Sequence, residues 1–393
     1  MSDVLALVRE FLAEHPPATT DDRELRGARF DAGLAFVHFD EGYGGLGLDL
    51  SLQPAVERAF LDAGCVDWSL RNVLGLGMAA ATIHVHGTHE QKVRYLRPLF
   101  TGEEIWCQLF SEPGAGSDLA ALATRAVPDG DEYVVNGQKV WTSLGHVAKR
   151  GLLVARTDPD KPKHRGMSYF IADMQAPGVE VRPLRQITGH AEFNEVYFSD
   201  ARIPAADLLG EVGDGWRVAM TTLMNERVAI GRRAGNRGTG HIAAAVEAYR
   251  EAAAAGVAEP GDRDRLMKLW ARVEANRLTN LRAAARTGQG VPGPEGSIAK
   301  LQYAELNKAV LEFAVDMHGD AAMLVEDYTF ARPEASSGGG QLDVRKAYLR
   351  SLANSIEGGT SDIMRNILGE RVLGLPGEPR TDRDLPWKDV PRS

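Results

Sequence analysis

Residues 111–118 of this sequence combine types that suit a phosphate-bearing ligand. They read Ser-Glu-Pro-Gly-Ala-Gly-Ser-Asp, so that two glycines flank an alanine beside small hydroxyls. Glycine lets a backbone approach a ligand closely, and Ser117 can offer a hydroxyl and an N–H to a phosphate. Taken alone, the segment is explained equally well by a plain turn.

A second segment, Trp141-Thr142-Ser143, follows Ser117 by 24 residues and ends a β-prone run. A tryptophan followed by hydroxyls offers an aromatic wall and hydrogen bonds to a flat ring system. On its own, a tryptophan in the protein core is the more common explanation. We expect His190 and His318 to be structural or loop residues rather than catalytic ones.

Other chemistries are disfavoured. Residues 42–47 match GxGxxG after the β-prone residues 35–39, but a dinucleotide-binding fold needs a second strand after the next helix. Another helix-like segment follows instead, which favours a glycine-rich turn between helices. CxxC, HExxH and carboxylate-rich metal loops are absent from the sequence, so we expect no catalytic metal. Cys65 and Cys107 are too few for a disulfide framework and fit a reducing cytoplasm.

The elements that must position these residues fall into three regions, an α+β multidomain arrangement. Residues 1–105 predict an N-terminal helical domain, residues 106–208 a β domain that is a sandwich or a barrel, and residues 209–393 a C-terminal domain of long helices packed in a bundle. In the middle region, Asn136-Gly137 lies between two β-prone runs and predicts a hairpin turn. Further short β-prone runs lie at residues 152–155, 167–171, 179–181 and 196–198.

Long helical patterns dominate the two outer regions. Residues 68–86 have almost no charge and predict a helix that is buried on most sides. Residues 215–250, 262–287 and 295–318 predict long helices of a bundle, with a break at residues 291–294 and a flexible loop at residues 336–340. We expect the last ten or so residues to form a loose tail.

Composition bounds the class of protein. The chain has 393 residues, with 45 Lys+Arg against 54 Asp+Glu, and its net charge of −9 disfavours a nucleic-acid partner. No stretch approaches the roughly 18 apolar residues that span a bilayer. The acidic start of the chain does not resemble a secretory signal, so we expect a cytoplasmic protein with no membrane partner.

Several segments of the sequence together resemble a known family. Residues 109–118 and 136–141 look like the flavin-binding signature of acyl-CoA dehydrogenases, and residues 357–363 with 370–376 look like that family's C-terminal signature. The resemblance runs in order from about residue 33 to residue 376. It implies a helical N-terminal domain, a β-barrel middle domain and a C-terminal four-helix bundle. It also implies bound FAD and oxidation of an acyl-CoA thioester to a 2-enoyl thioester, with the β-hydride passing to N5 of FAD.

The resemblance also implies site residues. Glu226 precedes Arg227 on the first long helix of the bundle and is the expected general base, with Arg227 beside the substrate. Glu357 is the competing base, or a residue that lines the substrate tunnel. The backbone N–H of Gly358 is expected to polarise the thioester carbonyl. The expected flavin contacts are Phe110, Ser111, Gly116, Ser117, Trp141, Ser143, Thr360 and Asp362.

Two segments differ from the family pattern at positions that bear on contacts between subunits. Residues 257–262 stand where many relatives carry Arg-x-x-Phe-Gly, and Asp316 and Asp320 replace the Gln and Gly of a flavin-contacting loop. Contacts across subunits are therefore less certain than in those relatives. The resemblance implies a homodimer or homotetramer, with a heteromer open, and an electron-transferring flavoprotein as re-oxidant. Two alternatives stand beside this function: a flavin oxidase of the same fold, and a partner subunit that completes another chain's active site.

Overall fold

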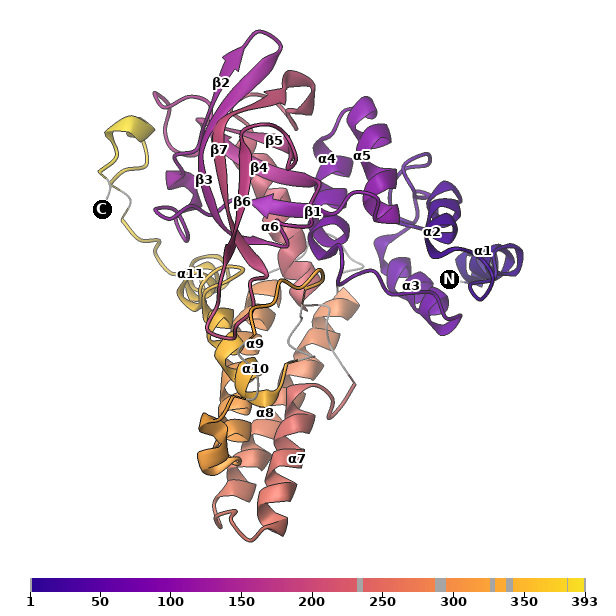
Figure 1. Cartoon of the computed structure of the whole chain (residues 1–393), viewed down its shortest axis with the longest axis vertical. Helices are drawn as coiled ribbons and strands as arrows, with labels where there is room; N and C mark the ends of the chain where they lie inside the picture. The colour runs from indigo at the N-terminus through magenta and orange to yellow at the C-terminus, as the bar shows by residue number, and fades with distance from the viewer. Residues whose placement is uncertain are drawn as a thin grey trace.

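The computed structural model describes residues 2–231, 236–286, 295–325, 329–336, 342–379 and 381–391. N-terminal helices lie beside a curled β-sheet, and long C-terminal helices extend away from the sheet (Figure 1). The predicted α+β architecture is confirmed: helices, then a barrel-like curled sheet, then a helical bundle.

The N-terminal region is helical as predicted. Its elements are α1 (Ser2–Glu14), α2 (Asp22–Asp31), η1 (Leu50–Leu52), α3 (Gln53–Asp62), the π-helical turn η2 (Gly75–Ala79), α4 (Ala80–His86) and α5 (His89–Thr101). A reciprocal cap between Thr88 and Gln91 starts α5, and Gly102, in a left-handed conformation, ends it.

Two predictions for this region are wrong. The helix expected over residues 68–86 begins only at residue 73, because the Asn72 side chain donates to the Leu99 carbonyl and accepts from Trp106 N–H. Residues 35–39 form turns rather than a strand. Phe36 N–H donates to the Gly44 carbonyl at 2.8 Å, and a side chain at Gly45 would meet the Phe39 carbonyl, which explains the glycine-rich turn.

Seven strands form one sheet in the order β1-β4-β2-β3-β7-β6, with β5 paired to β4. The strands are β1 (Trp106–Leu109), β2 (Arg125–Asp129), β3 (Glu132–Ser143), β4 (Arg150–Arg156), β5 (Met167–Asp173), β6 (Val179–Leu184) and β7 (Phe193–Pro204). Contacts also join β1 to β3 and β5 to β7, so the sheet curls over on itself. The predicted runs at residues 152–155, 167–171, 179–181 and 196–198 all lie in strands.

The hairpin turn is not where the Asn-Gly pair predicts it. The tight turn lies at Gly130-Asp131, between the paired residues Asp129 and Glu132. Asn136-Gly137 instead lies inside β3, at a register shift against β7. A side chain at Gly137 would lie 2.3 Å from Thr124 Oγ1, so this glycine serves close packing rather than a turn.

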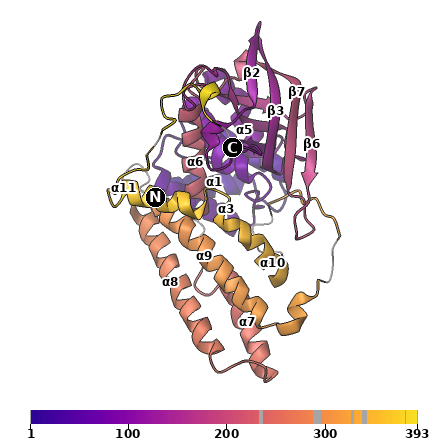
Figure 2. The same ribbon diagram turned by 90° about the vertical axis from the view of Figure 1, so that its left-hand side faces the viewer.

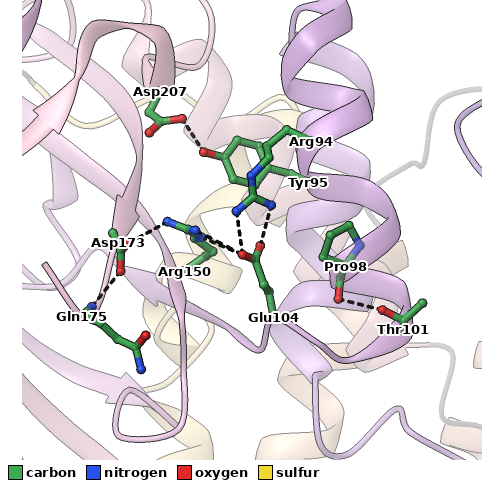
Figure 3. Close-up of polar contacts among 9 residues, drawn as sticks. All are labelled: Arg94, Tyr95, Pro98, Thr101, Glu104, Arg150, Asp173, Gln175 and Asp207. Carbon is green, nitrogen blue, oxygen red and sulfur yellow. Dashed lines mark hydrogen bonds and ion pairs between the residues drawn. The ribbon is translucent and has the colours of Figure 1, made fainter. Parts of the chain in front are cut away.

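A polar network joins α5 to the sheet (Figure 3). Glu104 accepts hydrogen bonds from Arg94 at 2.8 Å and from Arg150 at 3.1 Å. Burial opposes ionisation of Glu104, but these two arginines outweigh it and hold the pKa of this carboxyl below its usual value. Beside it, the Tyr95 hydroxyl donates to Asp207, and burial raises the pKa of Asp207.

The C-terminal region is a helical bundle built around one helix (Figure 2). Its helices are α6 (Gly215–Gly231), α7 (His241–Ala254), α8 (Asp262–Arg286), α9 (Glu295–Asp316), α10 (Val344–Ser351) and α11 (Ser361–Arg371). Each of the other five contacts α9. The single helix predicted over residues 215–250 is wrong, because Gly238 and Gly240 adopt left-handed conformations between α6 and α7. The break expected at residues 291–294 and most of the loop at residues 336–340 lie outside the described residues.

The loose tail predicted at the C-terminus is also wrong. After α11 the chain returns to the sheet, where Trp387 N–H donates to the Lys161 carbonyl at 2.9 Å. Trp387 Nε1–H donates to the Ala121 carbonyl at 3.2 Å. Among the described residues, no helix is long and apolar enough to cross a membrane.

Candidate active site

The loop after β1 carries the first predicted ligand segment. Phe110 is buried against Tyr169, with ring centroids 5.8 Å apart in an edge-to-face arrangement. The Ser111 carbonyl accepts from Val140 N–H at 2.9 Å, which fixes the loop to β3. Farther along, Gly116 and Ser117 are exposed, and a side chain built at Gly116 would meet nothing within 4 Å. A rigid loop base with an open, glycine-bearing tip suits close approach by a ligand.

A buried ion pair braces this loop against β3. Lys139 is fully buried, and its Nζ donates to the Phe110 carbonyl at 2.9 Å and to Glu112 Oε1 at 2.8 Å. The Glu112 carboxylate also accepts from the N–H groups of Ala123 and Thr124. Burial opposes ionisation of Glu112, but Lys139 and these donors hold the pKa of its carboxyl below its usual value. The sequence signal for this brace is a single Lys within the β-prone run that ends at Trp141.

Trp141 is not a core residue, contrary to the common explanation for a lone tryptophan. It has a left-handed φ of 60° and is 57% exposed. The residue lies where β3 shifts register against β7, between Lys139 and Thr142. Its indole packs edge-to-face on Phe193, with centroids 6.0 Å apart. Ser143 pairs with Phe193 in the sheet, so the Ser143 hydroxyl follows the exposed Trp141 ring by two residues.

The residues present fit a cofactor that carries a flat ring system and a phosphate. The Trp141 side chain is mostly exposed, yet the Trp141 backbone is held in a conformation that is rare for bulky residues. The open loop tip at Gly116 and Ser117 provides backbone and hydroxyl groups for a phosphate. Among the described residues, no group of His, Cys, Asp and Glu side chains could hold a metal ion.

The C-terminal signature forms a second ion-paired turn. The Glu357 carboxylate accepts from Arg350 at 2.9 Å and 3.1 Å and from Asn354 at 2.6 Å. Arg350 also donates to Glu192 at 2.9 Å. Glu357 is therefore engaged in a hydrogen-bonded network with Arg350 and Asn354.

Glycines and caps shape the rest of this turn. Gly358 and Gly359 have φ of 62° and 93°, and Lys300 donates to the Gly359 carbonyl. Thr360 caps α11 by accepting from Ile363 N–H at 3.1 Å, and the exposed Asp362 pairs with Arg365. Two left-handed residues in a row require glycine and set the direction of the backbone at Gly358.

Arg350 links the two signatures, although they lie more than 200 residues apart in the sequence. Its guanidinium carbon lies 5.3 Å from the Phe193 ring centroid, and Phe193 packs on Trp141. Sequence reasoning missed Arg350 because nothing in its local pattern marks it.

Helix α6 carries Glu226 and Arg227, whose side chains lie outside the described set. The helix is anchored one turn earlier: Thr222 Oγ1 lies 2.9 Å from the Tyr169 hydroxyl and 3.0 Å from Thr82 Oγ1. Tyr169 is the same residue whose ring packs on Phe110. The turn of α6 that precedes Glu226 is thus joined by direct contacts to the base of the signature loop.

Three family models of one kind cover the chain. It matches the acyl-CoA dehydrogenase N-terminal domain over residues 2–103, the middle domain over residues 107–201 and the C-terminal domain over residues 213–373. The chain therefore belongs to the acyl-CoA dehydrogenase family of FAD-dependent oxidoreductases, which confirms the resemblance seen in the sequence.

Named relatives agree with this assignment. The chain is 39% identical over 358 residues to acyl-CoA dehydrogenase IpdE1 of Mycobacterium tuberculosis, covering 89% of this chain and 86% of that protein. It is 38% identical to FadE34 of the same organism but spans only 47% of that protein's length, against 91% of its own.

Two similar solved structures carry the names of two components each. The Tcur3481-Tcur3483 steroid ACAD has a TM-score of 0.72 and 27% identity, covering 96% of this chain and 98% of that chain. The ChsE4-ChsE5 complex from Mycobacterium tuberculosis has a TM-score of 0.69 and 28% identity, covering 96% and 99%.

Proposed function

We propose that this chain binds FAD and oxidises an acyl-CoA thioester between Cα and Cβ, with Glu226 as the base that takes the α-proton. The observation that carries the proposal is the set of contacts from α6 to the flavin signature: Thr222 meets Tyr169, and Tyr169 packs on Phe110. These contacts bring the helix that bears the carboxylate to the loop expected to hold the cofactor.

Different residues of the chain have different roles in this reaction. The residues that would hold FAD are Phe110, Ser111, Gly116, Ser117, Trp141, Ser143, Thr360 and Asp362. When bound, FAD supplies the acceptor for the β-hydride. Glu226 takes the α-proton as the general base. The Gly358 N–H, directed by the two left-handed glycines, donates to the thioester oxygen and stabilises charge that develops there. By the family resemblance, Arg227 is proposed as a substrate-binding residue.

Glu357 is the weaker candidate for the base. To take a proton it would have to leave three hydrogen bonds from Arg350 and Asn354. These bonds fix the carboxylate within its own turn. We infer that Glu357 instead orders the turn that presents the Gly358 N–H and borders the substrate.

The test replaces each carboxylate in turn. Glu226→Gln should retain bound flavin but lose exchange of the substrate α-hydrogen with solvent by about 10²–10⁴-fold or more. Glu357→Gln, which keeps the size of the side chain, should retain most of that exchange. Exchange by Glu226→Gln at the wild-type rate would refute the assignment of the base.

A second candidate function is a subunit of a heteromeric acyl-CoA dehydrogenase, favoured because two similar solved structures are each named for two components. A chain that purifies colourless and gains flavin only on co-expression with a partner would support it. Homodimers or homotetramers with bound flavin would support the first proposal.

Substrate, acceptor and compartment complete the proposal. Flavin bleaching by a panel of straight-chain and steroid-derived acyl-CoAs would identify the acyl class, because one similar structure is titled a steroid ACAD. Hydrogen peroxide formed during turnover would indicate an oxidase, whereas reduction of an electron-transferring flavoprotein would indicate a dehydrogenase. We place the enzyme in the cytoplasm, where the free thiols of Cys65 and Cys107 stay reduced.

A further inference from the structure

Residues 381–391, the C-terminal segment, lie against the β domain rather than the bundle from which they emerge. In Figure 1 this yellow segment leaves α11 and runs up beside the sheet. It packs on the connection between β4 and β5: Pro386 forms a β-bridge with Pro162, and Lys388 pairs with Asp160 at 2.5 Å. The matched family model ends at residue 373, before this segment begins.

The segment reaches the turn that directly follows the flavin signature. Trp387 Nε1–H donates to the Ala121 carbonyl, the last residue of the short helical turn η3 (Leu119–Ala121). The buried Arg156 donates to the Ala120 carbonyl at 2.6 Å, and its guanidinium carbon lies 4.8 Å from the Trp387 ring centroid. Trp387 and Arg156 therefore hold the same turn from two directions.

A lysine bridge makes the second connection. Lys163 Nζ lies 2.7 Å from Asp118 Oδ2 and 2.6 Å from Asp382 Oδ2. Lys163 is 8% exposed, whereas the Asp118 side chain, next to Ser117, is more than half exposed. The bridge thus ties the exposed end of the signature loop to a segment more than 250 residues later in the chain.

We propose that the C-terminal segment positions the loop at residues 114–118 for FAD, through Asp382 on Lys163 and Trp387 on Ala121. The inference rests on the proposed function, since it concerns the same cofactor site. A loop with two glycines loses much conformational freedom when it closes on a ligand, which costs free energy. Holding the loop's end in place before FAD binds reduces that cost and increases affinity. Asp382 and Trp387 are positioning residues, because they act through Lys163 and Ala121.

The test uses the full chain with two conservative variants and a matched control. Asp382→Asn removes the charge facing Lys163, and Trp387→Phe removes the Nε1–H donor while keeping a ring. Asp384→Asn makes the same charge change at an exposed position of the same segment. FAD is titrated into the apoprotein of each, with thermal unfolding recorded for the apo and FAD-loaded forms and visible circular dichroism for the bound flavin.

We expect the FAD dissociation constant to rise about five- to tenfold in Asp382→Asn and Trp387→Phe, a change of roughly 1–1.4 kcal/mol, and to stay unchanged in Asp384→Asn. Equal loss of thermal stability by the apo and FAD-loaded forms means unchanged FAD affinity, and would overturn the proposal in favour of a purely structural role. If the wild-type chain binds FAD and both variants bind it with the same affinity, this inference alone is overturned. Wild-type chain that fails to bind FAD overturns the proposed function as well.

Discussion

Removal of the Lys139 ammonium should destabilise the protein strongly and through Glu112. In Lys139→Met an unbranched apolar side chain one heavy atom shorter remains, but the Phe110 carbonyl and the Glu112 carboxylate each lose a charged donor. Glu112 is 8% exposed, so water cannot replace the lost partner. Removing one partner of a buried ion pair costs about 3–5 kcal/mol, because the other charge remains buried without compensation.

The double variant separates the charge effect from the packing effect. Glu112→Gln in the Lys139→Met background removes the stranded charge and keeps an oxygen that can accept from Ala123 or Thr124 N–H. We expect the double variant to recover most of the stability lost in Lys139→Met, since replacing both members of a buried pair is often nearly neutral. The two substitutions should therefore be strongly non-additive.

The assay is thermal unfolding of apoprotein for the wild type, the two single variants and the double variant. A loss of 3–5 kcal/mol corresponds to a decrease of roughly 4–6 °C in Tm for a chain of this size. Lys139→Met within 2 °C of wild type, or a double variant less stable than Lys139→Met, would refute the view that the stranded carboxylate dominates the cost.

Three further outcomes are expected. Glu104→Gln should lower the free energy of unfolding by about 2 kcal/mol at pH 7. Arg94 and Arg150 outweigh burial and lower the pKa of Glu104, so this contribution to stability is present above the unfolded pKa near 4.5 and is lost as the pH falls through the lower folded pKa. The Tm values of wild type and variant should therefore converge below about pH 4.5. Divergence on acidification would contradict it. Gly137→Ala places a methyl group against the Thr124 backbone and should lower stability by about 1–3 kcal/mol, whereas Gly261→Ala, in open space, should not; equal Tm values for the two would argue against steric contact. Trp141→Ala should weaken FAD binding while changing the apoprotein Tm by no more than about 2 °C, since surface substitutions usually cost little; a large loss of apoprotein stability would show that the indole is a core residue after all.

Local patterns in the sequence predict much of the fold. The helices over residues 262–286 and 295–316 and the strands over residues 150–156 and 167–173 follow from periodicity and β-prone runs, since these depend on residues near one another in the chain. The signature residues, from Phe110 to Trp141 and from Glu357 to Asp362, were also identified from the sequence. Local turn chemistry was less reliable: Asn136-Gly137 has the composition of a turn, but its place against Thr124 makes it part of a strand.

The sequence by itself thus determined the family, the order of the domains and the candidate residues for holding FAD and moving a proton. The tertiary structure decided that Glu357 is paired with Arg350, that Trp141 is uncovered, and that the C-terminal segment is anchored by Lys163 and Trp387. The physical reason is that pairing and burial arise between residues separated by tens to hundreds of positions. A carboxylate, an indole or a polar tail takes its role from the partner that folding brings to it, and local sequence does not specify that partner.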